Sequence, residues 1–229
     1  MMLFVSVFEY AWKPFYLSNF KEADAKQLYS RVLTYFTLIA ALIFLVTGFF
    51  IEYIIRLPFL GGRFINPEFW SGLGIIPIIL GGYYFNGVFT NLAAGCHITK
   101  HTKYLPIAVG GGALLNVAAN ILLIPYFGIY GAAWATLLAY FISAAILFFI
   151  SRKIYPITYE FRRLFIILIS TLAVYFAATI MTIELDLVFA FIIKIFAILL
   201  FIGLLRVMGF FSSSELRRLK GFMGKKGSN

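Results

Sequence analysis

Residues 104–151 form an uninterrupted stretch of 48 residues without a charged side chain. About 20 apolar residues cross a bilayer, so this stretch is too long for one membrane helix. Pro125, Gly128 and Gly131 stand near its middle. Proline removes a backbone donor and glycine tolerates positive φ, which suits a tight reversal. We therefore predict two antiparallel membrane helices joined by a turn at residues 125–131.

Small and amide side chains recur along both helices of this hairpin. In the second helix they repeat every four residues, which indicates a face that a neighbouring helix approaches closely. We expect Leu147 of that helix to face lipid. Asn116 and Asn120 should face protein or a wet cavity, because an amide in hydrocarbon loses its hydrogen bonds. Hydrogen bonding between helices is the alternative role for them. The small-residue positions are Gly131, Ala135, Ala139 and Ser143, with Gly112 on the first helix.

The composition excludes an ordinary soluble domain. Apolar residues make up 62%, charged residues 12%, and the mean hydropathy is +0.96, whereas soluble domains carry about 25% charge. The net charge of +10 does not indicate a nucleic-acid partner, because the cations stand between apolar runs. Cys96 is the single cysteine, and we expect it to be a packing residue. His97 and His101 stand four residues apart without a third ligand nearby, so no metal, cofactor or redox centre is predicted.

The apolar runs and the charges between them divide the chain into six segments. Residues 1–12 are apolar but about half of a span, so we expect them to be the end of a longer membrane helix. The next linker should hold an interfacial helix at residues 18–28. The span that begins at Trp70 should be bent by Pro77, end near Thr90 and continue along the interface to Lys103. The segments are 1–12, a linker 13–31, four spans within 32–150, a linker 151–163, two spans within 164–208 and a basic tail 209–229.

Lysine and arginine are distributed unequally between the two sides of this arrangement. One side holds four of them in the linker 13–31, two after the Trp70 span, four in the linker 151–163 and six from Arg206 onward. The other side holds Arg56 and Arg63. Because cytoplasmic loops are enriched in Lys and Arg, we predict that the C-terminus is cytoplasmic. Glu52 and Arg56, four residues apart, should pair at the opposite interface.

The string from Asn120 to Thr136, NILLIPYFGIYGAAWAT, resembles the hairpin of bacterial polysaccharide exporters of the O-antigen flippase type. These belong to the superfamily that includes the multidrug and toxin extruders. Pro14 and Asp24 also match a linker of that family. The resemblance implies the C-terminal lobe of a two-lobe exporter followed by two further helices, in the bacterial inner membrane. The implied partners are membrane lipid, a lipid-linked oligosaccharide, and an N-terminal half that is missing here or supplied by another chain.

Ionisable and amide side chains within spans are the candidate substrate residues, since such groups are costly in lipid. Glu9 can meet a cation or take a proton. Lys194 can meet a phosphate or a carboxylate, or it snorkels or pairs with another helix. Asn86 shares a helix face with Thr90, and the pair lines a cavity or bonds between helices.

The sequence leaves other membrane functions open. A multidrug or cation antiporter of the same superfamily would usually carry more carboxylates within its spans than Glu9 supplies. A membrane-embedded polysaccharide polymerase should show a long external loop with Arg and acidic residues, and an acyltransferase an intramembrane histidine. Neither feature is present in the sequence, and we therefore expect a transporter and no enzyme.

Overall fold

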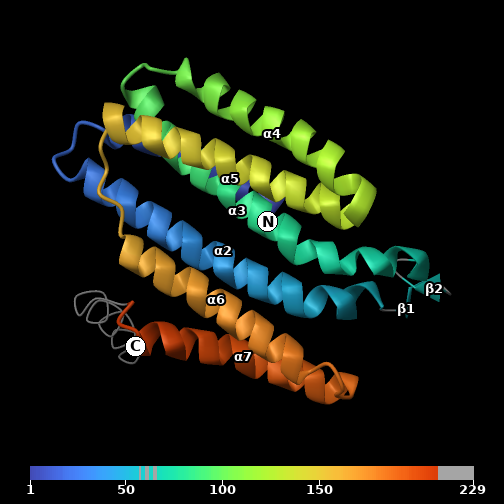
Figure 1. Ribbon diagram of the computed structural model, residues 1–229. Helices are drawn as coiled ribbons and strands as arrows, with labels where there is room; N and C mark the ends of the chain where they lie inside the picture. The colour runs from blue at the N-terminus through green and yellow to red at the C-terminus, as the bar shows by residue number, and fades with distance from the viewer. Residues whose placement is uncertain (57, 60–61, 64–65, 211–229) are drawn as a thin grey trace, which may run out of the picture. The chain divides into compact units, whose positions relative to one another are not determined.

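The computed structural model describes residues 1–56, 58–59, 62–63 and 66–210. The prediction of an all-α polytopic membrane bundle is confirmed, because helices dominate and six of those in the described ranges are long and apolar enough to cross a membrane (Figure 1). A two-residue β hairpin pairs Pro58 with Arg63. The elements are α1 (Met2–Asn19), α2 (Ala25–Ile55), β1 (Pro58–Phe59), β2 (Gly62–Arg63), the 3-10 helix η1 (Pro67–Ile75), α3 (Ile76–Ile98), α4 (Tyr104–Phe127), α5 (Ile129–Ile154), α6 (Phe161–Met181) and α7 (Leu187–Val207).

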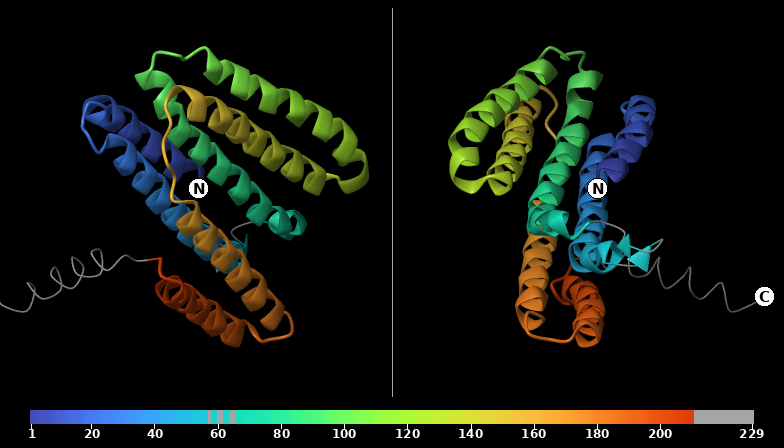
Figure 2. Two further views of the ribbon diagram at one scale, coloured as in Figure 1. Left: turned by 60° about the vertical axis from the view of Figure 1, so that its left-hand side comes forward. Right: turned by 90° about the vertical axis from the view of Figure 1, so that its right-hand side faces the viewer.

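The chain forms two compact units, residues 1–160 and 161–229, and each is described by itself. In unit 1, α3 packs against α1, α2 and α5, while α4 packs mainly against α5. Figure 2 shows the result, with α4 at one border of the unit and α5 between α4 and α3. α3 contacts α1, α2 and α5 extensively and α4 only slightly. It is therefore the helix against which the others are positioned.

α1 is longer than the sequence suggested. It continues through Pro14 to Asn19, past the segment boundary expected at residue 12, and the interfacial helix predicted at residues 18–28 is wrong because residues 20–24 are not helical. Aromatic packing explains the extension: the Trp12 ring meets Tyr16 and Tyr29 edge-on, with centroids 5.5 and 5.3 Å apart. These contacts lie on both sides of Pro14 and hold the helix together across it. The helix breaks instead at residues 20–24.

α2 starts at Ala25, inside the region expected to be linker. It has 31 residues, and at a rise of about 1.5 Å per residue its length exceeds the ~30 Å thickness of a bilayer core. α2 is therefore longer than one crossing requires, and its first two turns carry Lys26 and Arg31. At the other end the predicted ion pair between Glu52 and Arg56 is present, and the Arg56 guanidinium lies 4.8 Å from the centroid of the Trp70 ring.

The third helical segment differs from its predicted course. α3 runs without interruption to Ile98, so the residues after Thr90 continue the helix instead of turning along an interface. Pro77 occupies the first turn of α3, where its missing N–H breaks no hydrogen bond. The expected bend is therefore replaced by a change from 3-10 to α-helix at the start of α3.

The turn of the predicted hairpin consists of Gly128 alone. Its φ of 54° and ψ of −127° are outside the helical region, while Pro125 remains inside α4. Gly131 does not supply positive φ, contrary to expectation. It lies in α5, where a Cβ would come within 2.5 Å of the Leu123 carbonyl oxygen. Gly131 is therefore required for close approach of the two helices.

The predicted small-residue face joins α4 to α5. A Cβ on Gly112 would lie 1.9 Å from Ser143 Oγ and 2.6 Å from the Ala139 carbonyl oxygen. Ala135 on the same face is fully buried. Leu147, expected to face lipid, is also fully buried, because α3 covers the side of α5 that α4 leaves open.

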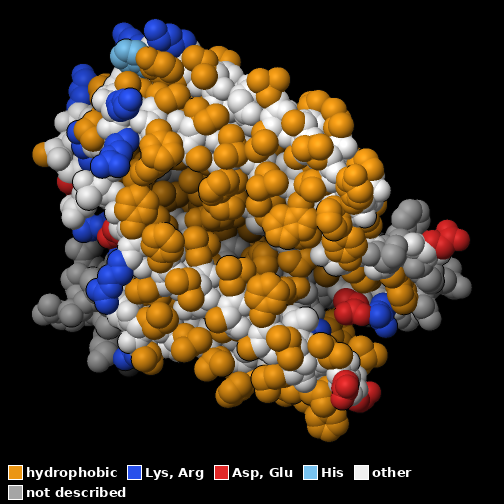
Figure 3. All heavy atoms as spheres, in the orientation of Figure 1, with side chains coloured by type: hydrophobic (Ala, Val, Ile, Leu, Met, Phe, Trp, Pro, Cys, Tyr) orange, Lys and Arg blue, Asp and Glu red, His pale blue; other side chains and the backbone are white. Residues whose placement is uncertain are grey.

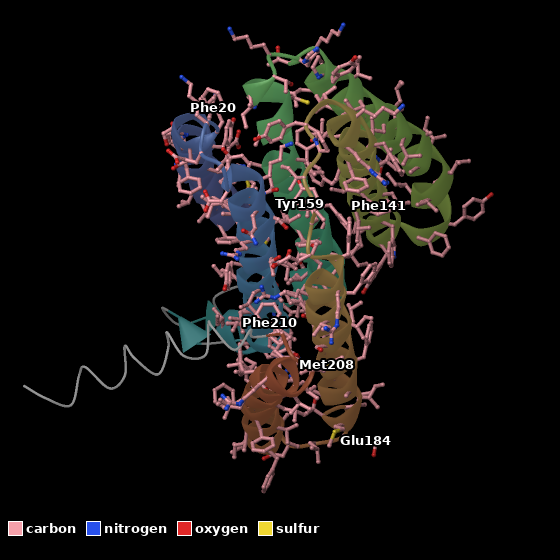
Figure 4. The ribbon with its side chains drawn as sticks, turned by 90° about the vertical axis from the view of Figure 1, so that its left-hand side faces the viewer. Phe20, Phe141, Tyr159, Glu184, Met208 and Phe210 are labelled. Atoms are coloured by element: carbon pink, nitrogen blue, oxygen red, sulfur yellow. The ribbon has the colours of Figure 1, made fainter. Side chains whose placement is uncertain are left out.

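Unit 2 contains the hairpin of α6 and α7, with Glu184 at its turn (Figure 4). Residues beyond α7 fold back onto α6 at Gly209, whose φ is 71°. Ser170 Oγ lies 3.4 Å from Met208 Sδ, and the Arg163 guanidinium lies 4.4 Å from the centroid of the Phe210 ring. The predicted tail from residue 211 onward lies outside the described residues.

The ends of five helices lie at one end of unit 1, which we call the basic end. α2 and α4 begin there, and α1, α3 and α5 finish there. Lys and Arg side chains gather at this end in the space-filling view (Figure 3). Topology thus places the cations of three separate linkers together. They are Lys13, Lys21, Lys26, Lys100, Lys103, Arg152 and Lys153.

Candidate functional site: a polar face on α1, α3 and α5

α1 and α3 run in the same direction with a constant register. Near the start of both helices, the Tyr83 hydroxyl donates to Met2 Sδ across 3.5 Å. At their ends, the Tyr16 hydroxyl lies 3.0 Å from His97 Nδ1. Each pair is separated by 81 positions in the sequence. Residues of α1 are therefore level with residues 81 positions later in α3.

This register brings two of the sequence candidates to the same place. Glu9 stands seven positions after Met2 and seven before Tyr16, so it shares their side of α1. Thr90 stands in the same relation to Tyr83 and His97. Glu9 is thus level with Thr90, one helical turn from Asn86. The Thr90 hydroxyl donates to the backbone carbonyl oxygen of Asn86 across 3.1 Å, and the Asn86 residue is partly exposed.

α5 contributes an aromatic side chain to this region. The rings of Tyr83 and Tyr140 lie 6.1 Å apart at their centroids. A Cβ on Gly82, the neighbour of Tyr83, would already touch the Leu137 backbone and the Tyr140 ring, so α3 and α5 are in close contact here. We call the surface formed by Glu9, Tyr83, Asn86, Thr90 and Tyr140 the polar face.

The polar face is accessible, because Glu9 is exposed and its other four members are partly exposed. It combines one carboxylate with an amide, three hydroxyl groups and two aromatic rings. Amides and hydroxyls both donate and accept hydrogen bonds, and an aromatic ring offers a flat apolar surface. This set of groups suits a ligand rich in hydroxyl groups.

A cluster of aromatic side chains supports the polar face at the basic end. Trp12, Tyr16 and Tyr29 are buried there together with Ala94, and the Tyr29 hydroxyl donates to the Tyr16 carbonyl oxygen across 2.9 Å. This cluster fixes the end of α1 against α2 and α3. Its bond from Tyr16 to His97 gives His97 a structural role within the bundle, where the sequence suggested only an interfacial location.

The other amide candidates lie on a different surface. Asn120 donates from Nδ2 to Asn116 Oδ1 across 2.9 Å, within α4. Both are partly buried, and α5 separates their helix from most of α3. The register of α1 on α3 thus places Glu9 within one helical turn of the level of Asn86, whereas Asn116 and Asn120 lie on α4. Lys194 lies in the middle of α7, in unit 2, and its role stays a prediction.

The segment after α5 contains contacts that sequence reasoning missed. Thr34 in α2 donates from its hydroxyl to Glu160 Oε2 across 2.8 Å. Tyr155 and Tyr159 place their rings 6.5 Å from Tyr29 and 6.4 Å from Phe148. Residues 155–160 therefore run along α2 and α5, and burial raises the pKa of the Tyr159 phenol. The signal available in the sequence was the polar spacing of Ser30, Thr34 and Thr37 along one face of α2.

The Cys96 thiol and both histidines lie near the basic end. Cys96 is fully buried, which confirms that it is a packing residue. Comparison with known proteins gives no further assignment: no protein-family model, no curated protein and no solved structure matches this chain.

Proposed function

We propose that this chain is part of an exporter that moves lipid-linked oligosaccharides across the bacterial inner membrane. In this proposal unit 1 belongs to the C-terminal lobe of a two-lobe exporter, and α6 and α7 are the two further helices. The basic end faces the cytoplasm, and the protein acts as a transporter without enzymatic activity. The hairpin motif at Asn120–Thr136 and the gathering of cations at one end support this proposal.

The polar face is the main observation that supports this proposed function. Asn86 and Thr90 lie in a helix apolar enough to cross a membrane, yet both are partly exposed. A polar group exposed to lipid is costly, so such side chains normally face protein or a water-filled cavity. Two tyrosine rings beside hydrogen-bonding groups can stack against sugar rings and bond their hydroxyl groups. The polar face therefore suits the oligosaccharide of a lipid-linked substrate.

Binding to the purified chain in lipid nanodiscs tests this proposal. The probes are a polyprenyl-diphosphate oligosaccharide and the same polyprenyl diphosphate without sugar. We expect the glycan-bearing lipid to bind more tightly, and Asn86→Leu to weaken it by about 2- to 10-fold, the equivalent of one hydrogen bond. Leu122→Ala, on the exposed side of α4, is the matched control and should have no effect.

Equal binding of the two lipids would contradict the proposal. The rival antiporter function predicts another result: a lipophilic cation such as tetraphenylphosphonium would bind in its place, and Glu9→Gln would abolish that binding. An exporter should bind the glycan-bearing lipid in a manner that depends on Asn86. An antiporter should bind the lipophilic cation in a manner that depends on Glu9.

A further inference from the structure

The most unusual polar side chain in the described part of unit 1 is Asn91, in the second half of α3. It is 1% exposed, and neither Nδ2 nor Oδ1 has a hydrogen-bond partner among the described residues. Buried side-chain amides are almost always hydrogen-bonded, because leaving a buried polar group unpaired costs ~1–3 kcal/mol. Asn91 therefore calls for a ligand that the protein itself does not provide.

A second unpartnered group lies on the facing part of α2. Ser30 is 2% exposed, and its Oγ has no hydrogen-bond partner among the described residues. Two contacts fix how the helices face each other: the hydroxyls of Thr37 and Tyr84 lie 3.4 Å apart, and Tyr29 packs in one cluster with Ala94. The helices are antiparallel, and both Ser30 and Asn91 fall between these contacts.

Asn91 also lies on the side of α3 that packs against α2 and α5. It stands one turn from Gly87 and one turn from Gly95 on the same side of α3. A Cβ on Gly87 would strike the Phe36 ring of α2 at 2.0 Å, and one on Gly95 would lie 2.8 Å from Ser151 Oγ of α5. Asn91, between these two glycines, therefore lies on a side of α3 that faces both α2 and α5.

We propose that Asn91 and Ser30 bind internal water between α2 and α3, separate from the polar face. A water molecule donates and accepts, and it needs two to four polar partners, which an amide and a hydroxyl supply. A cation is a poorer fit, because both residues are neutral and a buried charge requires a charged partner. The carboxylate of this region, Glu160, already accepts from Thr34. The water would extend that hydrogen bond into the helix pair.

A double-mutant cycle of thermal unfolding in detergent tests the water site. Asn91→Leu and Ser30→Ala should each lower Tm, and the double variant should lower it by less than the two changes added, because either change alone releases the water. The control pair combines Asn91→Leu with Ser143→Ala, a buried serine on the α4 side of α5. Their effects on Tm should add.

Two outcomes would overturn the proposal. If the amide is dry, Asn91→Leu raises Tm, because it replaces an unpaired polar group with an apolar one of similar size, and the cycle with Ser30→Ala shows no coupling. If the ligand is a cation, NaCl raises Tm of the natural chain relative to choline chloride, and Asn91→Leu removes that difference. NMR of the side-chain amides in nanodiscs gives an independent measure: the Asn91 NH₂ should show cross-peaks to water.

Discussion

The Tyr16 hydroxyl lies 3.0 Å from His97 Nδ1, and this contact fixes how far α1 extends along α3. Met2 and Tyr83 are separated by the same 81 residues. α1 and α3 therefore stay in register over their shared length. Glu9 reaches the level of Asn86 and Thr90 only because of this register. The geometry of the polar face thus depends on a contact two helical turns away from Glu9.

Replacement of Tyr16 by phenylalanine tests this contact. Tyr16→Phe removes the hydroxyl but keeps the ring that packs on Trp12, so we expect a loss of about 0.5–1.5 kcal/mol in unfolding free energy. Tyr10→Phe is the matched control, since Tyr10 is 87% exposed and the change should leave stability unaltered. Thermal unfolding in detergent measures both. Equal stability of the two variants would show that the hydrogen bond does not hold α1.

Packing between α4 and α5 is tested at two glycines of the same helix. Gly112→Ala would press a Cβ against Ser143 and the Ala139 carbonyl, and such overpacking typically costs ~1–3 kcal/mol. Gly110→Ala has open space around the added Cβ and should stabilise α4 by up to about 1 kcal/mol, since alanine favours helix. The yield of folded protein and its Tm should therefore both fall for Gly112→Ala and both rise for Gly110→Ala. A shift of the same sign at both positions would exclude the close approach of α4 and α5.

The turn between α4 and α5 should be sensitive to any side chain. Gly128 combines positive φ with a ψ of −127°, a conformation that costs other residues about 1–3 kcal/mol. Gly128→Ala should therefore lower Tm although nothing lies within 4 Å of its added Cβ. Gly203→Ala in α7, where the space is equally open but the backbone is helical, should not. Tolerance of Gly128→Ala would mean that the reversal uses another backbone conformation.

The proposed orientation requires a reporter other than Cys96, which is fully buried. In a Cys96→Ala background, Lys100→Cys marks the basic end, and Tyr126→Cys, at an 82% exposed position, marks the opposite end of unit 1. We expect a membrane-impermeant thiol reagent to label the second variant in intact cells and the first only after lysis, because cations favour the cytoplasmic side. The reverse pattern of labelling would invert the orientation.

Local sequence determined the features of this protein that depend on apolar length and on single residues. Uncharged runs defined the membrane helices, and Pro125 and Gly128 located the hairpin turn to within a few residues. The four-residue spacing of Glu52 and Arg56 was enough to predict their ion pair, because both partners share one helix face. The recurrence of small residues likewise identified the side of α5 that α4 approaches.

The tertiary structure decided what depends on contacts between distant segments. Pro14 predicts the end of a helix, yet α1 continues past it because Trp12 packs on Tyr29. Glu9 and Asn86 were separate candidates in the sequence, and the register of α1 on α3 places them within one helical turn of the same level, while Asn116 and Asn120 lie on α4. Asn91 was not among the predicted residues, because the sequence of an apolar run does not reveal whether an amide within it is buried or lacks a hydrogen-bond partner. These properties arise from which faces meet, and side chains far apart in the chain determine that choice through packing.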